Sequence, residues 1–72
     1  MRTKRVISSA VAAVGYDAEH RVLEVRFRSG RRYFYLDVPA RAYRELIAAE
    51  SIGTYLNESI KPRYRAVRVR EE

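Results

Sequence analysis

Tyrosines and arginines gather in the middle of the chain in a pattern typical of nucleic-acid binding. Tyr33 and Tyr35 are separated by one residue, and strand alternation predicts that Arg26, Arg28 and Arg31 lie beside them. Aromatic rings can stack on unpaired bases, each contributing about 1–3 kcal/mol, while cations hold the neighbouring phosphates. If these side chains share one face of a sheet, they form a stacking platform for RNA.

A second basic set lies near the C-terminus and comprises Lys61, Arg63 and Arg65, with Arg68 and Arg70 further along. Phosphate contacts need charge and reach but little geometric precision, so an extended basic segment suits them. The alternative for the last residues is a frayed, solvated end.

Residues suited to catalysis or metal binding are sparse. The chain has no cysteine and one histidine, His20, which lies beside Asp17 and Glu19. A metal site needs three or four converging ligands, so we interpret this group as a solvated loop. No serine has a histidine base at an interpretable spacing, and no cofactor fingerprint is present. We therefore expect no catalytic residues, no cofactor, no metal and no enzymatic activity.

The charge balance favours a polyanionic partner. Fifteen Lys and Arg residues against nine Asp and Glu residues leave a net charge of +6 in 72 residues, which fit one domain. The absence of cysteine suits a reducing cytoplasm, where we place the protein. No apolar run approaches the ~20 residues of a membrane span, and we expect no membrane association.

The first residues imitate a signal peptide, because Arg2, Lys4 and Arg5 precede an apolar stretch. Ser8 and Ser9 interrupt that stretch, so we expect it to be retained. We interpret residues 1–7 as a basic flexible arm and residues 8–70 as a single domain.

Three strands are predicted, over residues 10–16, 21–28 and 31–38. Leu23, Val25 and Phe27 alternate with polar residues, as in a half-buried antiparallel strand. A two-residue turn at Ser29-Gly30 would pair Val25 with Phe34, and a four-residue loop at 17–20 would pair Val14 with Leu23.

This register places Tyr33 and Tyr35 on the sheet face opposite the core. If residues 54–64 instead folded across that second face, both tyrosines would become core. The pattern leaves the two arrangements open.

The next predicted element is a helix over residues 39–50, whose apolar positions make a stripe at helical spacing: Ala42, Tyr43, Leu46 and Ile47. A short helical turn over 54–60 and a strand or ordered tail over 64–70 follow. The predicted fold is α+β, a three-stranded antiparallel meander with one helix packed on one face, then a short helical turn and a basic C-terminal strand or tail. The expected core is Leu23, Val25, Phe27, Phe34, Leu36, Leu46 and Ile47.

Several short motifs carry a resemblance to a known family. They are Gly15-Tyr16-Asp17, Leu23-Glu24-Val25-Arg26-Phe27 with Ser29-Gly30, Tyr33-Phe34-Tyr35, Val38-Pro39, Tyr43, Ala49, Ser51-Ile52-Gly53, Tyr55-Leu56-Asn57, Ile60 and Tyr64. In this order, from about Ser8 to Arg68, they resemble the KTSC domain, which occurs alone in bacterial proteins and at the C-terminus of some lysyl-tRNA synthetases.

The resemblance implies a compact domain without catalytic residues, and the synthetase association suggests RNA binding. Ile52 stands where the family often has lysine, which weakens any phosphate contact there. We therefore expect a small basic module that binds RNA or other single-stranded nucleic acid. The alternative is a protein-interaction or self-association module, since Tyr and Arg also anchor protein interfaces.

Overall fold

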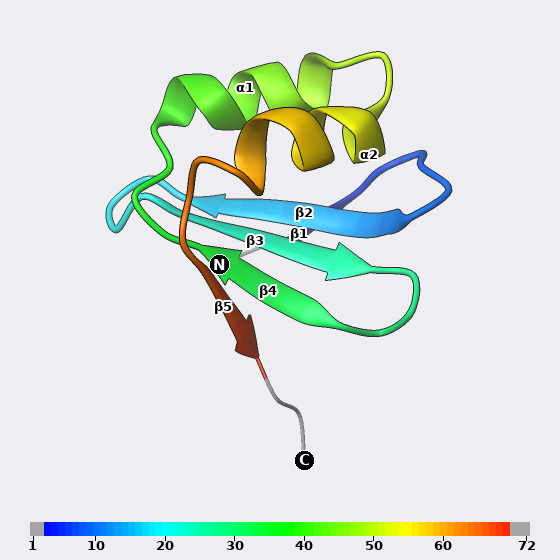
Figure 1. Cartoon of the computed structure of the whole chain (residues 1–72), viewed down its shortest axis with the longest axis horizontal. Helices are drawn as coiled ribbons and strands as arrows, with labels where there is room; N and C mark the ends of the chain where they lie inside the picture. Colours follow the sequence, from blue (N-terminus) through cyan, green and yellow to red (C-terminus); the bar gives the residue numbers. More distant parts are fainter. Residues whose placement is uncertain (1–2, 70–72) are drawn as a thin grey trace.

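The chain folds into one antiparallel sheet with its helices on one face, as the computed structural model shows for residues 3–69 (Figure 1). Five strands lie side by side in chain order: β1 (Thr3–Arg5), β2 (Val11–Asp17), β3 (Val22–Phe27), β4 (Arg32–Tyr35) and β5 (Ala66–Val69). The helical segments are α1 (Ala40–Ala48), α2 (Ile52–Tyr55) and η1 (Leu56–Ile60), a π-helical turn continuous with α2. The predicted α+β class is confirmed.

Two edge strands extend the predicted three-stranded meander. Thr3–Arg5 pairs with Ala13–Gly15, so the expected flexible arm is wrong for residues 3–5; the first two residues of that arm lie outside the described part. At the other edge β5 pairs with β4, so the C-terminal segment is a strand over Ala66–Val69. In both cases the edge strand pairs with a strand whose identity depends on how the sheet is assembled, and the sequence pattern of the edge strand itself does not reveal that partner.

The β2–β3 hairpin keeps the predicted inner face but changes its partners. Val14 pairs with Val25 instead of Leu23, because the loop spans residues 18–21 and uses Arg21 at a positive φ of 58°. A shift of two residues preserves the face of each side chain. An irregularity between Val11 and Ala13 brings Val11 into the core, where the predicted pairing placed Ala10 and Ala12.

The β3–β4 hairpin differs from the prediction by one residue, and this reverses β4. The Phe27 N–H donates to the Arg31 carbonyl at 2.9 Å and the Gly30 N–H donates to the Phe27 carbonyl at 3.0 Å, which makes a three-residue loop over 28–30. Gly30 takes the positive φ of 96° that such a loop requires. Val25 therefore pairs with Tyr33, not with Phe34.

The one-residue shift moves the tyrosines to the helix-covered face. Tyr35 is 2% exposed and belongs to the core, whereas Tyr33 is half-buried beside it. Phe34, predicted as core, lies on the other face, and the predicted core residue Leu36 is half-buried. Of the two arrangements that the sequence left open, the core arrangement holds for Tyr35, and the two rings do not lie on a free sheet face.

The helices cover the sheet through a short apolar stripe. Pro39 precedes α1, which buries Ala42 and Leu46; Ile47, predicted as core, is 37% exposed. The Ser51 hydroxyl accepts a hydrogen bond from the Thr54 N–H at 3.3 Å and begins α2. Buried side chains continue along α2 and η1 as Ile52, Leu56 and Ile60, which complete the core against β2, β3 and β4.

The face of the sheet away from the helices is organised around one carboxylate. Glu24 is 4% exposed, with the Arg32 Nε at 3.1 Å and an Arg26 terminal nitrogen at 4.0 Å from the same oxygen, Oε2. The two guanidinium groups act as counterions for this nearly buried carboxylate, which would otherwise be costly to remove from water. Within residues 3–69, no helix is long and apolar enough to cross a membrane.

Candidate nucleic-acid interface

A pocket of about 650 Å³ begins at the β3–β4 loop and extends along β4. Its walls come from that loop, from strands β3, β4 and β5, from the segment before β2 and from Lys61, which follows η1. The lining residues are Ser9, Ala10, Phe27, Arg28, Ser29, Arg31, Tyr33, Tyr35, Lys61 and Ala66. This set brings together five of the eight predicted site residues, which are Arg28, Arg31, Tyr33, Tyr35 and Lys61.

Three aromatic rings form the apolar part of the pocket. Phe27 and Tyr33 meet edge to face, with centroids 5.7 Å apart and an interplanar angle of 84°, and Tyr33 lies 6.4 Å from Tyr35 at a tilt of 33°. Burial, followed by the nearby Tyr33, raises the pKa of the Tyr35 phenol, which therefore stays neutral at physiological pH. Tyr35 is buried, so Tyr33 is the tyrosine ring of this pocket that a ligand can reach.

Three exposed cations surround these rings. The Arg28 Nε donates to the Ser8 carbonyl at 2.6 Å. That bond uses one of five guanidinium donors and orients the group. The Lys61 Nζ lies 5.4 Å from the Phe27 ring centroid, which is within range of a cation–π interaction. Arg31 is exposed in the loop, and among the described residues no carboxylate lines the pocket.

The π-helical turn places Lys61 at the pocket. The Lys61 N–H donates at 2.9 Å to the Leu56 carbonyl, five residues earlier. Leu56 and Ile60 are buried and hold the turn against the sheet. Pro62 follows and lacks the N–H that would continue the helix.

The sequence matches the KTSC domain over residues 7–64. This chain belongs to the KTSC domain family. A protein of Tsukamurella paurometabola is 47% identical over 62 residues, covering 86% of this chain and 92% of the relative. An uncharacterised protein of Stutzerimonas stutzeri is 39% identical over 64 residues, covering 89% and 90%.

The crystal structure of a KTSC domain protein from Yersinia pestis is similar to this chain, with a TM-score of 0.92 and 33% identity over 96% of this chain and 97% of that one. The family match contains every lining residue of the pocket except Ala66, which lies on β5. The pocket is therefore built almost wholly from the KTSC domain itself.

Three predicted site residues lie outside the pocket. Arg26 is on the opposite face of this KTSC domain, beside Glu24. Arg63 and Arg65 are exposed in the segment between η1 and β5, and the Arg65 carbonyl accepts from the Leu36 N–H at 2.9 Å. Phe27 was expected only as core, yet it lines the pocket because it is the last residue of β3.

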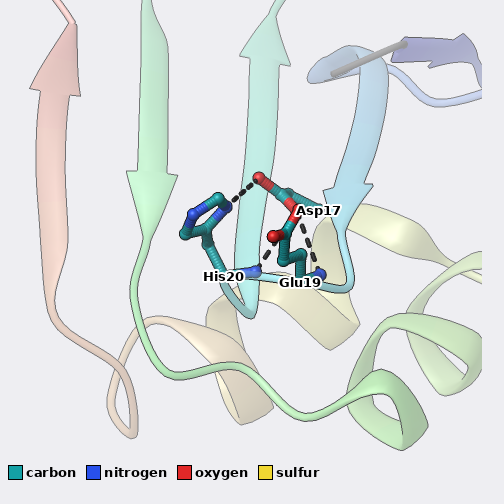
Figure 2. Close-up of side chains that lie close together, drawn as sticks. All are labelled: Asp17, Glu19 and His20. Atoms are coloured by element: carbon teal, nitrogen blue, oxygen red, sulfur yellow. Dashed lines mark hydrogen bonds and ion pairs between the residues drawn. The ribbon is translucent and has the colours of Figure 1, made fainter.

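The group at Asp17, Glu19 and His20 forms the turn after β2, as Figure 2 shows. The Asp17 Oδ2 lies 2.8 Å from the His20 Nδ1, and the Asp17 Oδ1 accepts backbone N–H bonds from Glu19 at 3.1 Å and His20 at 3.2 Å. The side-chain bond with His20, then the backbone bonds, hold the pKa of Asp17 below its usual value. These bonds stabilise the turn that follows β2 and bring the three side chains close together.

Proposed function

We propose that this KTSC domain binds single-stranded nucleic acid, RNA in particular, in the pocket that extends from the β3–β4 loop along β4. One observation carries the proposal: an accessible tyrosine ring lies among three cations in a concavity that no described carboxylate lines. The base would stack at Tyr33, and Arg28, Arg31 and Lys61 would bind phosphate oxygens.

Base stacking and phosphate contacts would both stabilise such a complex. A stacked base contributes about 1–3 kcal/mol, and phosphate contacts release counterions from the strand. The net charge of +6 would attract a polyanion before contact. Arg63 and Arg65 follow Lys61 in an exposed segment, so in this proposal they contact phosphates further along the strand.

The proposal differs from the sequence-based expectation at Arg26. That guanidinium lies on the far face near Glu24, so we leave it out of the binding site. Tyr35 also changes role: as a buried ring it supports Tyr33 and would not stack on a base. The module proposed here binds and does not catalyse.

Binding to a short fluorescent single-stranded RNA, measured by anisotropy at low salt, tests this function. We expect Tyr33→Leu and Arg31→Ala each to weaken binding about tenfold, because one stacking or phosphate interaction is worth about 1.4 kcal/mol. Arg44→Ala is the matched control, since Arg44 is exposed on α1 and does not line the pocket. Equal losses for Arg31→Ala and Arg44→Ala, with no loss for Tyr33→Leu, would show that only net charge matters.

Self-association or protein binding is the rival function. It is favoured by the sheet face without helices, where Val67 is 45% exposed beside its cross-strand neighbour Phe34. Sedimentation velocity over a range of concentrations distinguishes the two. A concentration-dependent dimer that binds no RNA or single-stranded DNA at low salt would replace the nucleic-acid proposal.

A further inference from the structure

The pocket offers one stacking position, which limits how much of a strand it can hold. Tyr35 is 2% exposed, and the Lys61 ammonium already lies over the Phe27 ring at 5.4 Å. Tyr33 remains as the ring against which a base can lie. Proteins that bind single strands along their length place successive bases on successive aromatic side chains. A single accessible ring in the pocket suits a single nucleotide.

The charge around that position exceeds what one internal phosphate requires. An internal phosphodiester carries one negative charge, whereas a terminal phosphate monoester carries about −1.5 to −2 at pH 7 and offers three oxygen acceptors. Arg28, Arg31 and Lys61 all line the pocket. The carboxylate nearest in sequence to this loop, Glu24, is paired with Arg32 on the opposite face and does not neutralise them.

The positions of two cations are constrained before any ligand binds. Arg28 is tied to the Ser8 carbonyl at 2.6 Å, and the Lys61 ammonium lies 5.4 Å from the centroid of the Phe27 ring. Groups held in place lose less conformational freedom on binding a small anion. Three cations, two of them constrained, suit a compact doubly charged group better than an extended backbone.

We infer that the pocket recognises one terminal nucleotide, an aromatic base that carries a phosphate monoester. This rests on the proposed function and narrows its ligand. The same chemistry is offered by a free nucleoside monophosphate and by the phosphorylated end of an RNA strand. Recognition is by stacking at Tyr33 and by Arg28, Arg31 and Lys61 around the monoester.

The test compares matched ligands on the full chain by competition against a labelled RNA. Hexaribonucleotides of one sequence carry a 5′-phosphate, a 3′-phosphate or only hydroxyl ends. A hydroxyl-ended octaribonucleotide controls for charge, because its two additional diesters supply at least as much negative charge as the terminal monoester. Adenosine 5′-monophosphate and adenosine form the second arm, which distinguishes a free nucleotide from a strand end.

We expect the 5′-phosphorylated or the 3′-phosphorylated hexamer to bind at least tenfold tighter than the hydroxyl-ended hexamer and octamer. Arg31→Ala and Lys61→Ala should each remove most of that preference, whereas Arg44→Ala should keep it, with circular dichroism showing each variant folded. Adenosine 5′-monophosphate binding tighter than adenosine, with no preference among strands, would support the inference with the free nucleotide as ligand. Hydroxyl-ended and phosphorylated ligands that bind equally would overturn the inference and leave RNA binding intact. No binding by any ligand would overturn both.

Discussion

Two tyrosines separated by one residue have different structural roles in this fold. Tyr35 belongs to the core with Leu23 and Val25, whereas Tyr33 lies half-buried at the pocket. Their side chains share a face because β4 alternates, but the helices cover only the Tyr35 end fully. The same residue type thus serves packing at one position and access at the other.

Replacing each tyrosine by alanine should distinguish these two roles by the loss of stability. Tyr35→Ala leaves a cavity in the core and should lower the free energy of unfolding by about 3–5 kcal/mol, as for other buried aromatic rings. Tyr33→Ala should cost less than half as much, because its ring is partly exposed. Urea unfolding followed by circular dichroism measures both. Equal losses would mean that Tyr33 is core and cannot stack on a base.

Asp17 gives the turn after β2 a dependence on pH. Hydrogen bonds, led by the one with His20, lower the pKa of Asp17 in the folded chain. Because the pKa of Asp17 is lower in the folded chain than its usual value of about 3.9, its carboxylate stabilises the fold at a pH above that usual value. That stabilisation is lost as the pH falls through the lowered pKa.

Asp17→Ala should therefore lower the melting temperature at pH 7, and the difference from the parent should shrink as the pH is lowered to about 2, because the stabilisation is lost as the carboxylate becomes protonated. Glu19→Ala in the same turn is the control, since only the backbone N–H of Glu19 bonds to Asp17. Thermal unfolding at the two pH values measures the effect. A deficit of equal size at both would assign it to the lost side chain and not to its charge.

At the scale of elements, the β3–β4 loop decides which face β4 presents. Residues 28–30 form the connection, and the hydrogen bonds at Phe27 set Val25 opposite Tyr33. A two-residue loop would turn every side chain of the strand over. The pocket exists only with the longer loop, because that loop puts Tyr33 and Phe27 on the same face.

Gly30→Ala tests the conformation of this loop. A Cβ at Gly30 would meet no atom within 4 Å, so the cost comes from the positive φ of 96° and should be about 1–3 kcal/mol. Ser29→Ala, a neighbour without a conformational demand of this kind, should change stability by less than about 0.5 kcal/mol. Chemical denaturation of both variants measures the difference, and an unaffected Gly30→Ala would argue for another loop geometry.

At the scale of the molecule, cations on different faces should contribute differently to RNA binding. Arg31 lines the pocket, whereas Arg26 lies on the opposite face beside Glu24. The Arg26 side chain faces away from the pocket, so a phosphate bound there does not contact it.

The dependence of RNA affinity on salt should reveal this asymmetry. For single strands, each neutralised phosphate adds about 0.7 to the slope of log K against log salt, so Arg31→Ala should reduce the slope by about 0.7. Arg26→Ala should leave the slope nearly unchanged, and Tyr33→Leu should weaken binding at constant slope, because stacking releases no counterions. Equal slope losses for Arg26→Ala and Arg31→Ala would place the strand outside the pocket.

The local pattern of the sequence determined the main elements and the family. Leu23, Val25 and Phe27 alternate as a strand, and Ala42 and Leu46 recur at helical spacing, so the α+β class and the helix-covered sheet were predictable. The sequence also showed directly which cations and tyrosines lie close together along the chain. These properties depend on near neighbours, which the sequence displays directly.

The tertiary structure alone decided which of these side chains meet. One residue more in the β3–β4 loop brought Tyr33 and Tyr35 to the helix-covered face, and the π-helical turn carried Lys61 to Phe27. Thr3–Arg5 became an edge strand because β2 offered a free edge. A strand's register has a period of two, so an error of one residue reverses its faces, and pairing between distant segments leaves no periodic signal in either.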